Sequence, residues 1–128
     1  MQGVTVVDFK VLIVDDDYIN RKLLISILNK KLYQIQTIES VDGADALRSC
    51  YEHPDIQLIL LDIEMPNVNG LEFLKLFNQN KKLQKIPLIA ISSNDLHKQD
   101  AYEVGADMFV VKPITEDKLF DAIRQISI

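Results

Sequence analysis

One apolar stretch limits what this chain can fold into more than any other. The sequence IQLILLDIEMPNVNG runs from Ile56 to Gly70, and four aliphatic residues, 58–61, follow one another in it without a polar break. Such a strand is typical of the interior of a parallel sheet, where helices cover both faces. The run ends at Asp62, and an ionised carboxylate does not belong in a core. We therefore predict a central strand that carries Asp62 to the edge where open α/β sheets bind ligands.

The rest of the chain alternates between strand-like and helix-like segments. Strands are predicted at residues 10–14, 33–38, 56–61, 88–91 and 108–111. Five helices are predicted between and after these strands. The first ends near Lys31, the second runs from Asp42 to His53, and the third follows Gly70. The fourth runs from the capping residues 92–95 to Val104, before Gly105, and the fifth begins at Thr115. This alternation predicts one α/β domain, in which a parallel sheet has helices on both faces and right-handed crossovers.

The predicted helices should pack against the sheet through apolar stripes. In the first helix this stripe consists of Ile19, Leu23, Leu24, Ile27 and Leu28. In the second it consists of Ala44, Ala46, Leu47 and Cys50. Residues 66–70 carry the proline, asparagines and glycine of a turn that separates the central strand from the third helix.

Composition narrows the class of protein. The 128 residues suit one domain: residues 1–9 have no clear period and receive no role beyond a leader or edge, and residues 10–128 form the domain. The net charge of −5 argues against direct nucleic-acid binding, and no apolar run reaches the length of a membrane span. Cys50 has no second cysteine with which to pair, so we expect a buried helix residue and a cytoplasmic protein.

Four of the predicted strands end in polar side chains that should gather at one edge of the sheet. They are Asp15 and Asp16, then Asp62, Ser92 and Lys112. Each taken alone is ordinarily a turn residue, a helix cap or a solvated charge, and the conjunction is what indicates a site. Clustered carboxylates favour a hard divalent cation, and Mg²⁺ fits best because it retains waters and shares a phosphate oxygen. The chemistry indicated is formation of an aspartyl phosphate on Asp62.

The motifs VLIVDDD, LILLDIEMPNVNG, IPLIAISS and GADMFVVKPI resemble those of the receiver domains of two-component response regulators, from Lys10 onward. The resemblance implies a flavodoxin-like (βα)5 domain with strand order 2-1-3-4-5 and a phosphoacceptor at Asp62. It implies that Mg²⁺, for which Mn²⁺ can substitute, is bound by Asp16, by Asp62 and by the backbone carbonyl of Glu64. Asp15 would act through a metal-bound water.

The same resemblance assigns the remaining positions of the site. Ser92 stands for the switch hydroxyl, Lys112 pairs with the phosphoryl group, and Phe109 takes the place of the aromatic residue that follows the switch. It also implies a cis Lys112–Pro113 peptide. Glu64 and Asn94 would flank the phosphoryl group and tune reaction rates, and the hydroxyl of Ser93 would crowd the approach. His53 and His97 stand in no motif and are interpreted as ordinary surface or helix-end residues.

The resemblance further implies a signalling domain and not an enzyme, apart from self-phosphorylation and self-dephosphorylation at Asp62. A histidine kinase or histidine phosphotransfer protein would dock near the first helix. The face formed by the fourth helix, fifth strand and fifth helix would then act on a downstream effector protein, with a phosphorylation-driven homodimer left open. A stand-alone regulator, a relay intermediate and the receiver of a hybrid kinase all agree with the sequence.

Two other classes remain as alternatives. A phosphatase of the haloacid-dehalogenase type also uses an aspartyl phosphate, and Asp15 with Asp17 gives its spacing, but that motif requires a threonine where Ile19 stands. A receiver-like module that binds partners without phosphorylation would have no chemical need for all of the polar residues at the strand ends. A nucleotide-binding domain is disfavoured because no glycine-rich loop follows the first strand.

Overall fold

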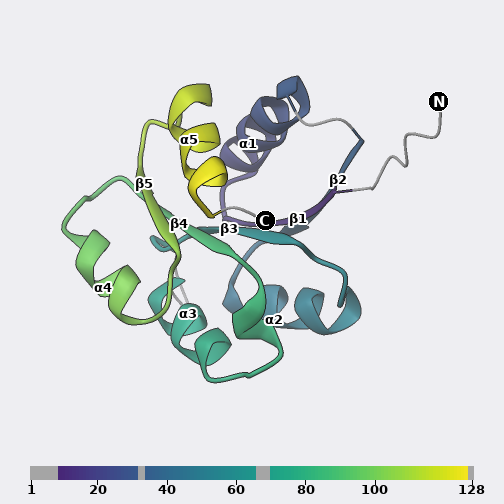
Figure 1. Cartoon of the computed structure of the whole chain (residues 1–128), viewed down its shortest axis with the longest axis vertical. Coiled ribbons are helices and arrows are strands. Elements are labelled where there is room, and N and C mark those ends of the chain that lie inside the picture. Colours follow the sequence, from purple (N-terminus) through teal and green to yellow (C-terminus); the bar gives the residue numbers. More distant parts are fainter. Residues whose placement is uncertain (1–8, 32–33, 66–69, 127–128) are drawn as a thin grey trace.

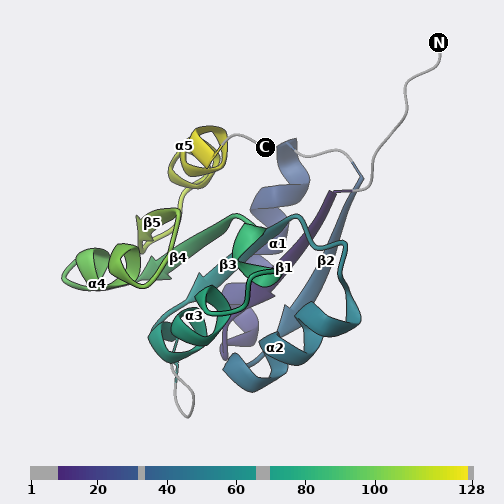
Figure 2. The same cartoon turned by 60° about the horizontal axis from the view of Figure 1, so that its bottom comes forward.

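The computed structural model describes residues 9–31, 34–65 and 70–126. Five parallel strands form one sheet in the order β2-β1-β3-β4-β5, and the sheet twists from one edge to the other (Figures 1 and 2). The strands are β1 (Phe9–Val14), β2 (Ile35–Ser40), β3 (Leu58–Asp62), β4 (Leu88–Ser92) and β5 (Met108–Val111). The doubly wound fold and the predicted strand order are confirmed.

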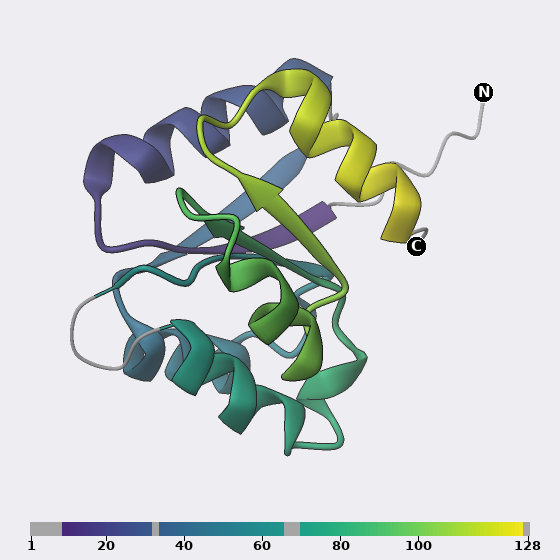
Figure 3. The ribbon, with the colours of Figure 1, turned by 90° about the vertical axis from the view of Figure 1, so that its left-hand side faces the viewer.

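Helices cover both faces of this sheet. They are α1 (Tyr18–Lys31), α2 (Gly43–Glu52), α3 (Gly70–Asn78), α4 (His97–Glu103) and α5 (Glu116–Ile126), with a 3-10 turn, η1 (Leu83–Lys85), between α3 and β4. Helices α1 and α5 lie on one face, and α2, α3 and α4 lie on the other (Figure 3). None of the helices in the described ranges is long and apolar enough to cross a membrane.

The core is divided by the sheet into two clusters. One packs the sheet against α2 and α3, where the rings of Phe73 and Phe77 stack with centroids 5.7 Å apart. The other packs it against α1 and α5 through residues such as Leu28 and Leu119. Every residue of β3 and β4 is buried, including the polar residues Asp62 and Ser92 at their ends. The central strand is thus covered on both faces, as its apolar sequence predicts.

Several helix ends form as their sequences predict. Asp42 caps α2, with its Oδ1 accepting the N–H of Asp45 at 2.8 Å, and His53 closes the helix. Gly105 follows α4 with a φ of 115°, a conformation that favours glycine. At the start of α5, the hydroxyl of Thr115 accepts the N–H of Lys118 at 3.2 Å.

The predicted buried stripe of α1 is wrong at two positions. Leu24, Ile27 and Leu28 are buried, but Ile19 is 74% and Leu23 48% exposed. At 3.6 residues per turn, Ile19 and Leu23 lie on the shoulder of the helix, roughly a quarter turn or more from the centre of the buried face. On the opposite shoulder, half-buried Arg21 bonds to Glu39 of β2 at 2.9 Å. The buried face of α1 is therefore turned toward Arg21.

Two other boundaries and the buried face of α2 differ from prediction. β2 begins at Ile35 and ends at Ser40, two residues later than predicted. Ala44 is exposed, and α2 buries Gly43 and Ser49 alongside Ala46 and Cys50. Phe9, which was assigned to the N-terminal leader, is the first residue of β1. The remaining residues of that leader and the predicted turn at 66–69 lie outside the described residues.

The start of α4 also differs. Asn94 and Asp95 do not cap it as predicted, because they form a turn in which the Oδ1 of Asn94 accepts the N–H of Leu96 at 3.0 Å. Leu96 directly precedes the helix and provides no side-chain cap. The turn shortens α4 to 7 residues, of which only Ala101 is buried. Helix α4 is consequently the most weakly anchored helix of the described fold.

Candidate functional site

The polar residues at the strand ends are brought together by the backbone of the sheet. Asp62 and Ser92 are the last residues of β3 and β4, and Asp15 and Lys112 directly follow β1 and β5. Sheet-like hydrogen bonds continue past the strands, since the Asp15 N–H donates to the Ser40 carbonyl at 3.0 Å and the Lys112 N–H to the Ser92 carbonyl at 2.8 Å. The predicted gathering at the carboxyl edge is therefore present, at the ends of hydrogen-bonded strands of which β3 and β4 are fully buried.

Three carboxylates form the centre of the site. One oxygen from each of Asp15, Asp16 and Asp62 lies within 4.8 Å of the others. Asp15 is 1% and Asp62 3% exposed, whereas Asp16 lies at the surface. Backbone amides hold the two buried groups: Asp17 N–H donates to Asp15 at 2.8 Å and Glu64 N–H donates to Asp62 at 2.9 Å. The carboxylates are thus oriented before any ligand arrives.

The charge of this cluster is incompletely balanced. Among the ion pairs of the described residues, the cation that pairs with this cluster is Lys112, whose Nζ lies 3.4 Å from Asp62 Oδ2. Burial raises the pKa of Asp15 to about 6, and the nearby charge of Asp62 adds to this rise. Burial also raises the pKa of Asp62, against the opposing effects of the Glu64 amide and Lys112. Two buried acids that resist ionisation are typical of a site that gains from a further positive charge.

The donor set fits a hard divalent cation. It consists of carboxylate oxygens, two of them buried, and contains no soft ligand. Mg²⁺ is bound in proteins through one or two carboxylates and retained waters, and shares phosphate oxygens readily. Asp15, Asp16 and Asp62 could therefore hold it. The structure gives no test of the predicted ligand role of the Glu64 carbonyl.

Ser92 has contacts that the sequence did not suggest. Its buried Oγ accepts the N–H of Asn94 at 3.0 Å and lies 2.9 Å from Nδ1 of His97, the first residue of α4. We interpreted His97 as an ordinary surface or helix-end residue; it does begin a helix, but its ring also lies against the proposed switch hydroxyl. Only the close spacing of His97 after Ser92 and the turn residue Asn94 could have signalled this contact.

Glu64 is held across the mouth of the site. Its Oε1 accepts the N–H of Ser93 at 2.6 Å, and the hydroxyl of Ser93 donates to Oε1 and Oε2 at 2.8 and 2.9 Å. These bonds, the amide first, hold the pKa of Glu64 below its ordinary value, and Ser92 adds to the effect. The predicted crowding by Ser93 is thus a specific pairing with Glu64.

The structure also describes the other positions singled out from the sequence. Phe109 is 9% exposed and packs in the cluster beneath α2 and α3, so a further inward turn of its ring would bury little additional surface. Lys112–Pro113 is cis, as the resemblance implied. Asp17 bonds the N–H of Ile19 at 2.8 Å and serves the start of α1. Burial raises the pKa of the Cys50 thiol to about 11, as expected for an unreactive helix residue.

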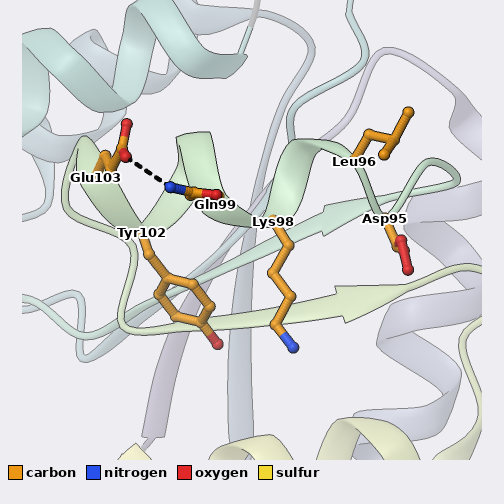
Figure 4. Close-up of a pocket in the computed structure, with 6 residues that line it drawn as sticks. All are labelled: Asp95, Leu96, Lys98, Gln99, Tyr102 and Glu103. Carbon is orange, nitrogen blue, oxygen red and sulfur yellow. Dashed lines mark hydrogen bonds between the residues drawn. The ribbon is translucent and has the colours of Figure 1, made fainter.

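Two surface hollows lie near these elements. One, of about 420 Å³, adjoins the carboxylates, and its walls include Asp15, Leu23, Lys112 and Pro113. The other, of about 630 Å³, lies on the outer side of α4 and is not lined by Asp15, Asp16 or Asp62 (Figure 4). Figure 4 shows Lys98 and Tyr102 projecting to the same side of α4. The first hollow gives access to the site, and the second belongs to the surface of the helix that carries His97.

Comparison with known proteins gives consistent matches. The family model of the response regulator receiver domain matches residues 11–124. The polar-differentiation response regulator DivK of Brucella ovis is 34% identical over 118 residues, which are 89% of this chain and 92% of DivK. The two-component response regulator ORR11 of Oryza sativa subsp. indica is 33% identical over 106 residues, which are 81% of this chain and 71% of ORR11.

Solved structures agree with these sequence matches. The chemotaxis protein CheY4 of Vibrio cholerae superposes with a TM-score of 0.80 at 26% identity, over 94% of this chain and 99% of that protein. These findings give no support to the haloacid-dehalogenase alternative.

Proposed function

The chain belongs to the response regulator receiver domain family, whose members are phosphoacceptor signalling switches, and on this premise we propose that Asp62 is the residue that receives the phosphoryl group. The observation that carries the proposal is the position of this carboxylate. Asp62 is buried at the end of the central strand, oriented by the Glu64 amide and 3.4 Å from Lys112. We further propose that the domain extends from β1, which begins at Phe9, to residue 128.

The proposed reaction is a transfer from phosphohistidine. A carboxylate oxygen of Asp62 attacks phosphorus, an O–P bond forms, and the P–N bond to the donor imidazole breaks. The imidazole leaves with the electron pair of that bond and takes up a proton. Hydrolysis resets the switch when water attacks phosphorus, which releases inorganic phosphate and restores the Asp62 carboxylate. These self-reactions are the only catalysis that we propose.

The residues around Asp62 position and neutralise the transferred group. Lys112 supplies an ammonium on the Oδ2 side of Asp62, and Ser92 supplies a hydroxyl that can donate to a phosphoryl oxygen. Asp15, Asp16 and Asp62 would hold Mg²⁺ or Mn²⁺, with the Glu64 carbonyl as a further ligand. When bound, the ion neutralises negative charge that develops on the phosphoryl oxygens. Glu64 and Asn94 remain the proposed rate-tuning positions.

The proposed donor is a histidine kinase or histidine phosphotransfer protein. Exposed Ile19 and Leu23 lie on the shoulder of α1, and Leu23 also lines the hollow that leads to Asp15 and Lys112. Exposed apolar residues at the entrance of a charged site are typical of a partner surface. We propose that the donor docks there and presents its phosphohistidine through the hollow. We propose a cytoplasmic location, in line with the single unpaired cysteine.

The proposed output surface is formed by α4, β5 and α5. Phosphorylation would shift a two-state equilibrium in which Ser92 moves toward the phosphoryl group and Phe109 adjusts its ring. The exposed side of α4, with Leu96 82% and Tyr102 38% exposed, offers apolar area to an effector protein (Figure 4).

Intact mass after incubation with acetyl phosphate and Mg²⁺ tests this proposal. We expect the wild type to gain one phosphoryl group, and an Asp62→Asn variant, which keeps the shape of the side chain, to gain none. No gain by the wild type, in a sample shown to bind Mg²⁺, would favour a receiver-like module that binds partners without phosphorylation. Turnover of a small phosphate ester by the wild type would point to a phosphatase.

A further inference from the structure

The switch hydroxyl is already in use in this structure. Ser92 Oγ is buried, accepts the N–H of Asn94 at 3.0 Å and lies 2.9 Å from His97 Nδ1. His97 is the first residue of α4, and its own N–H donates to the Asn94 carbonyl at 3.1 Å. The end of β4, the turn at Asn94 and the start of α4 are therefore joined through one hydroxyl and one imidazole.

The contact matters because a serine hydroxyl can donate only one hydrogen bond. A hydroxyl has one hydrogen to donate and two lone pairs with which to accept. The Asn94 amide uses one lone pair. If the hydroxyl hydrogen is directed to an unprotonated Nδ1, it is not available to a phosphoryl oxygen. Phosphorylation then requires that Ser92 release His97.

We propose that His97 is a positioning residue that holds Ser92 in its resting orientation, and that release of this bond links phosphorylation at Asp62 to helix α4. The inference rests on the proposed function, because His97 would compete with the phosphoryl group on Asp62 for the Ser92 hydroxyl. Helix α4 is suited to such a link, since it is short and buries only Ala101. The imidazole belongs to the first residue of that helix. Loss of the bond therefore removes the side-chain link between the end of β4 and the start of α4.

One other acceptor stands near the hydroxyl. The Glu64 carboxylate accepts the N–H of Ser93, the residue next to Ser92, at 2.6 Å, and Ser92 helps to hold its pKa down, so this carboxylate is a second candidate acceptor for the hydrogen. Glu64 is, however, already held by the amide and hydroxyl of Ser93. The two arrangements predict different effects of removing the imidazole, because a hydroxyl that donates to Glu64 does not depend on His97.

The test is the affinity for beryllofluoride, a mimic of the acyl phosphate, in excess Mg²⁺. Removing the imidazole in His97→Ala should tighten binding about fivefold, which corresponds to one hydrogen bond of about 1 kcal/mol that no longer needs to be broken. His97→Asn is the matched control, because its amide oxygen can take the place of Nδ1 as an acceptor. We expect His97→Asn to bind within about twofold of the wild type.

A Ser92→Ala background isolates the pair. In that background His97→Ala should leave the affinity unchanged, since no hydroxyl remains to be held. The ¹⁵N shifts of His97 should show an unprotonated Nδ1 in the resting protein. Equal or weaker binding by His97→Ala, an undiminished gain in the Ser92→Ala background, or a protonated Nδ1 that donates to Ser92 would each overturn the inference.

The same titration separates this inference from the function on which it rests. If the wild type and His97→Ala bind beryllofluoride equally well, Asp62 remains a phosphoacceptor and only the role of His97 fails. If neither binds it although Mg²⁺ binds both, the proposed function fails and the inference fails with it. Thermal unfolding of each variant confirms that the compared proteins are folded.

Discussion

At the residue scale, the buried carboxylate of Asp15 lowers the stability of the metal-free fold. Its carboxylate is buried beside that of Asp62, and the ammonium of Lys112 is 3.4 Å from Asp62. In the absence of a cation, ionising both acids destabilises the folded state. An amide at position 15 would relieve this repulsion and could still accept the Asp17 amide.

Asp15→Asn should therefore stabilise the metal-free protein at pH 8, by about 1 to 3 kcal/mol. It should also lose most of the rise in unfolding temperature that Mg²⁺ gives the wild type, because fewer carboxylates attract the ion. Thermal unfolding without Mg²⁺ and with about 10 mM Mg²⁺, enough to saturate a weak site, measures both effects. A metal-free variant less stable than the wild type would contradict this account of the charge balance.

Glu64 illustrates a second effect at the same scale. Its carboxylate is fixed at the mouth of the site by Ser93, where it repels anions that approach Asp62. Glu64→Asn should speed phosphorylation by acetyl phosphate about two- to fivefold, in line with one partly screened charge, and change the decay of the phosphorylated form. Ser93→Ala should have a smaller effect, because the amide bond to Glu64 remains. Mass spectrometry over time measures both rates, and unchanged rates would rule out this role.

At the scale of elements, a charge cluster joins α1 to β2. Arg21 and Lys22 both pair with Glu39, at 2.9 and 2.7 Å, and Lys22 first, then Arg21, holds the pKa of Glu39 below its ordinary 4.5. A lowered folded-state pKa stabilises the protein above the unfolded pKa, and this contribution is lost as pH falls through the folded value. Because the Glu39 side chain is partly exposed, solvent screens its charge and keeps this contribution to stability small.

Glu39→Gln should accordingly lower the free energy of unfolding by about 0.5 kcal/mol at pH 7. The difference between variant and wild type should shrink below pH 4.5 and vanish once the folded-state carboxyl is protonated. Urea unfolding at pH 7 and at a series of lower pH values provides the comparison. A difference that does not depend on pH would mean that packing, and not charge, links Glu39 to α1.

The exposed shoulder of α1 gives a further prediction at this scale. Ile19→Ala should slow transfer from a cognate histidine phosphotransfer protein about fivefold or more, as expected for an apolar anchor of a partner surface. It should leave phosphorylation by acetyl phosphate unchanged, because Ile19 is 74% exposed and lies outside the site. Parallel assays with the two donors make the comparison. Equal slowing with both donors would place the effect in the site itself.

The same helix shows what sequence could and could not predict. The strands and the carboxylate cluster follow from apolar runs that end in charge, because parallel strands bring their ends to one edge, whereas the strand order was implied by the resemblance to receiver domains. The buried face of α1 could not be predicted, since Ile19 fits the apolar period and the pairing of Arg21 with Glu39 on β2 is a tertiary contact. The bond between Ser92 and His97 escaped prediction because it depends on the turn at Asn94.

At the scale of the whole molecule, one sheet separates two apolar clusters that must form together. Phe73 is fully buried in the cluster beneath α2 and α3 and stacks on Phe77. Phe73→Ala should lower the free energy of unfolding by about 3 to 5 kcal/mol, because it leaves a cavity in a close-packed core. Leu23→Ala, at a 48% exposed position, should change it by less than about 0.5 kcal/mol.

Urea unfolding followed by circular dichroism and by tyrosine fluorescence measures these changes. The two signals should coincide for the wild type and for both variants, because the strands that serve the two clusters are the same strands. Separate transitions would show that the two faces of the sheet unfold independently.

The shallow seating of α4 has a consequence for how a signal leaves the molecule. A helix that rests on a single buried alanine can slide or tilt without uncovering the interior, so its displacement requires little work. The strands that hold Asp62 and Ser92 are locked on all sides and cannot move so freely. A disturbance at the buried centre is therefore expected to displace α4 more than the strands, in agreement with the proposed output surface.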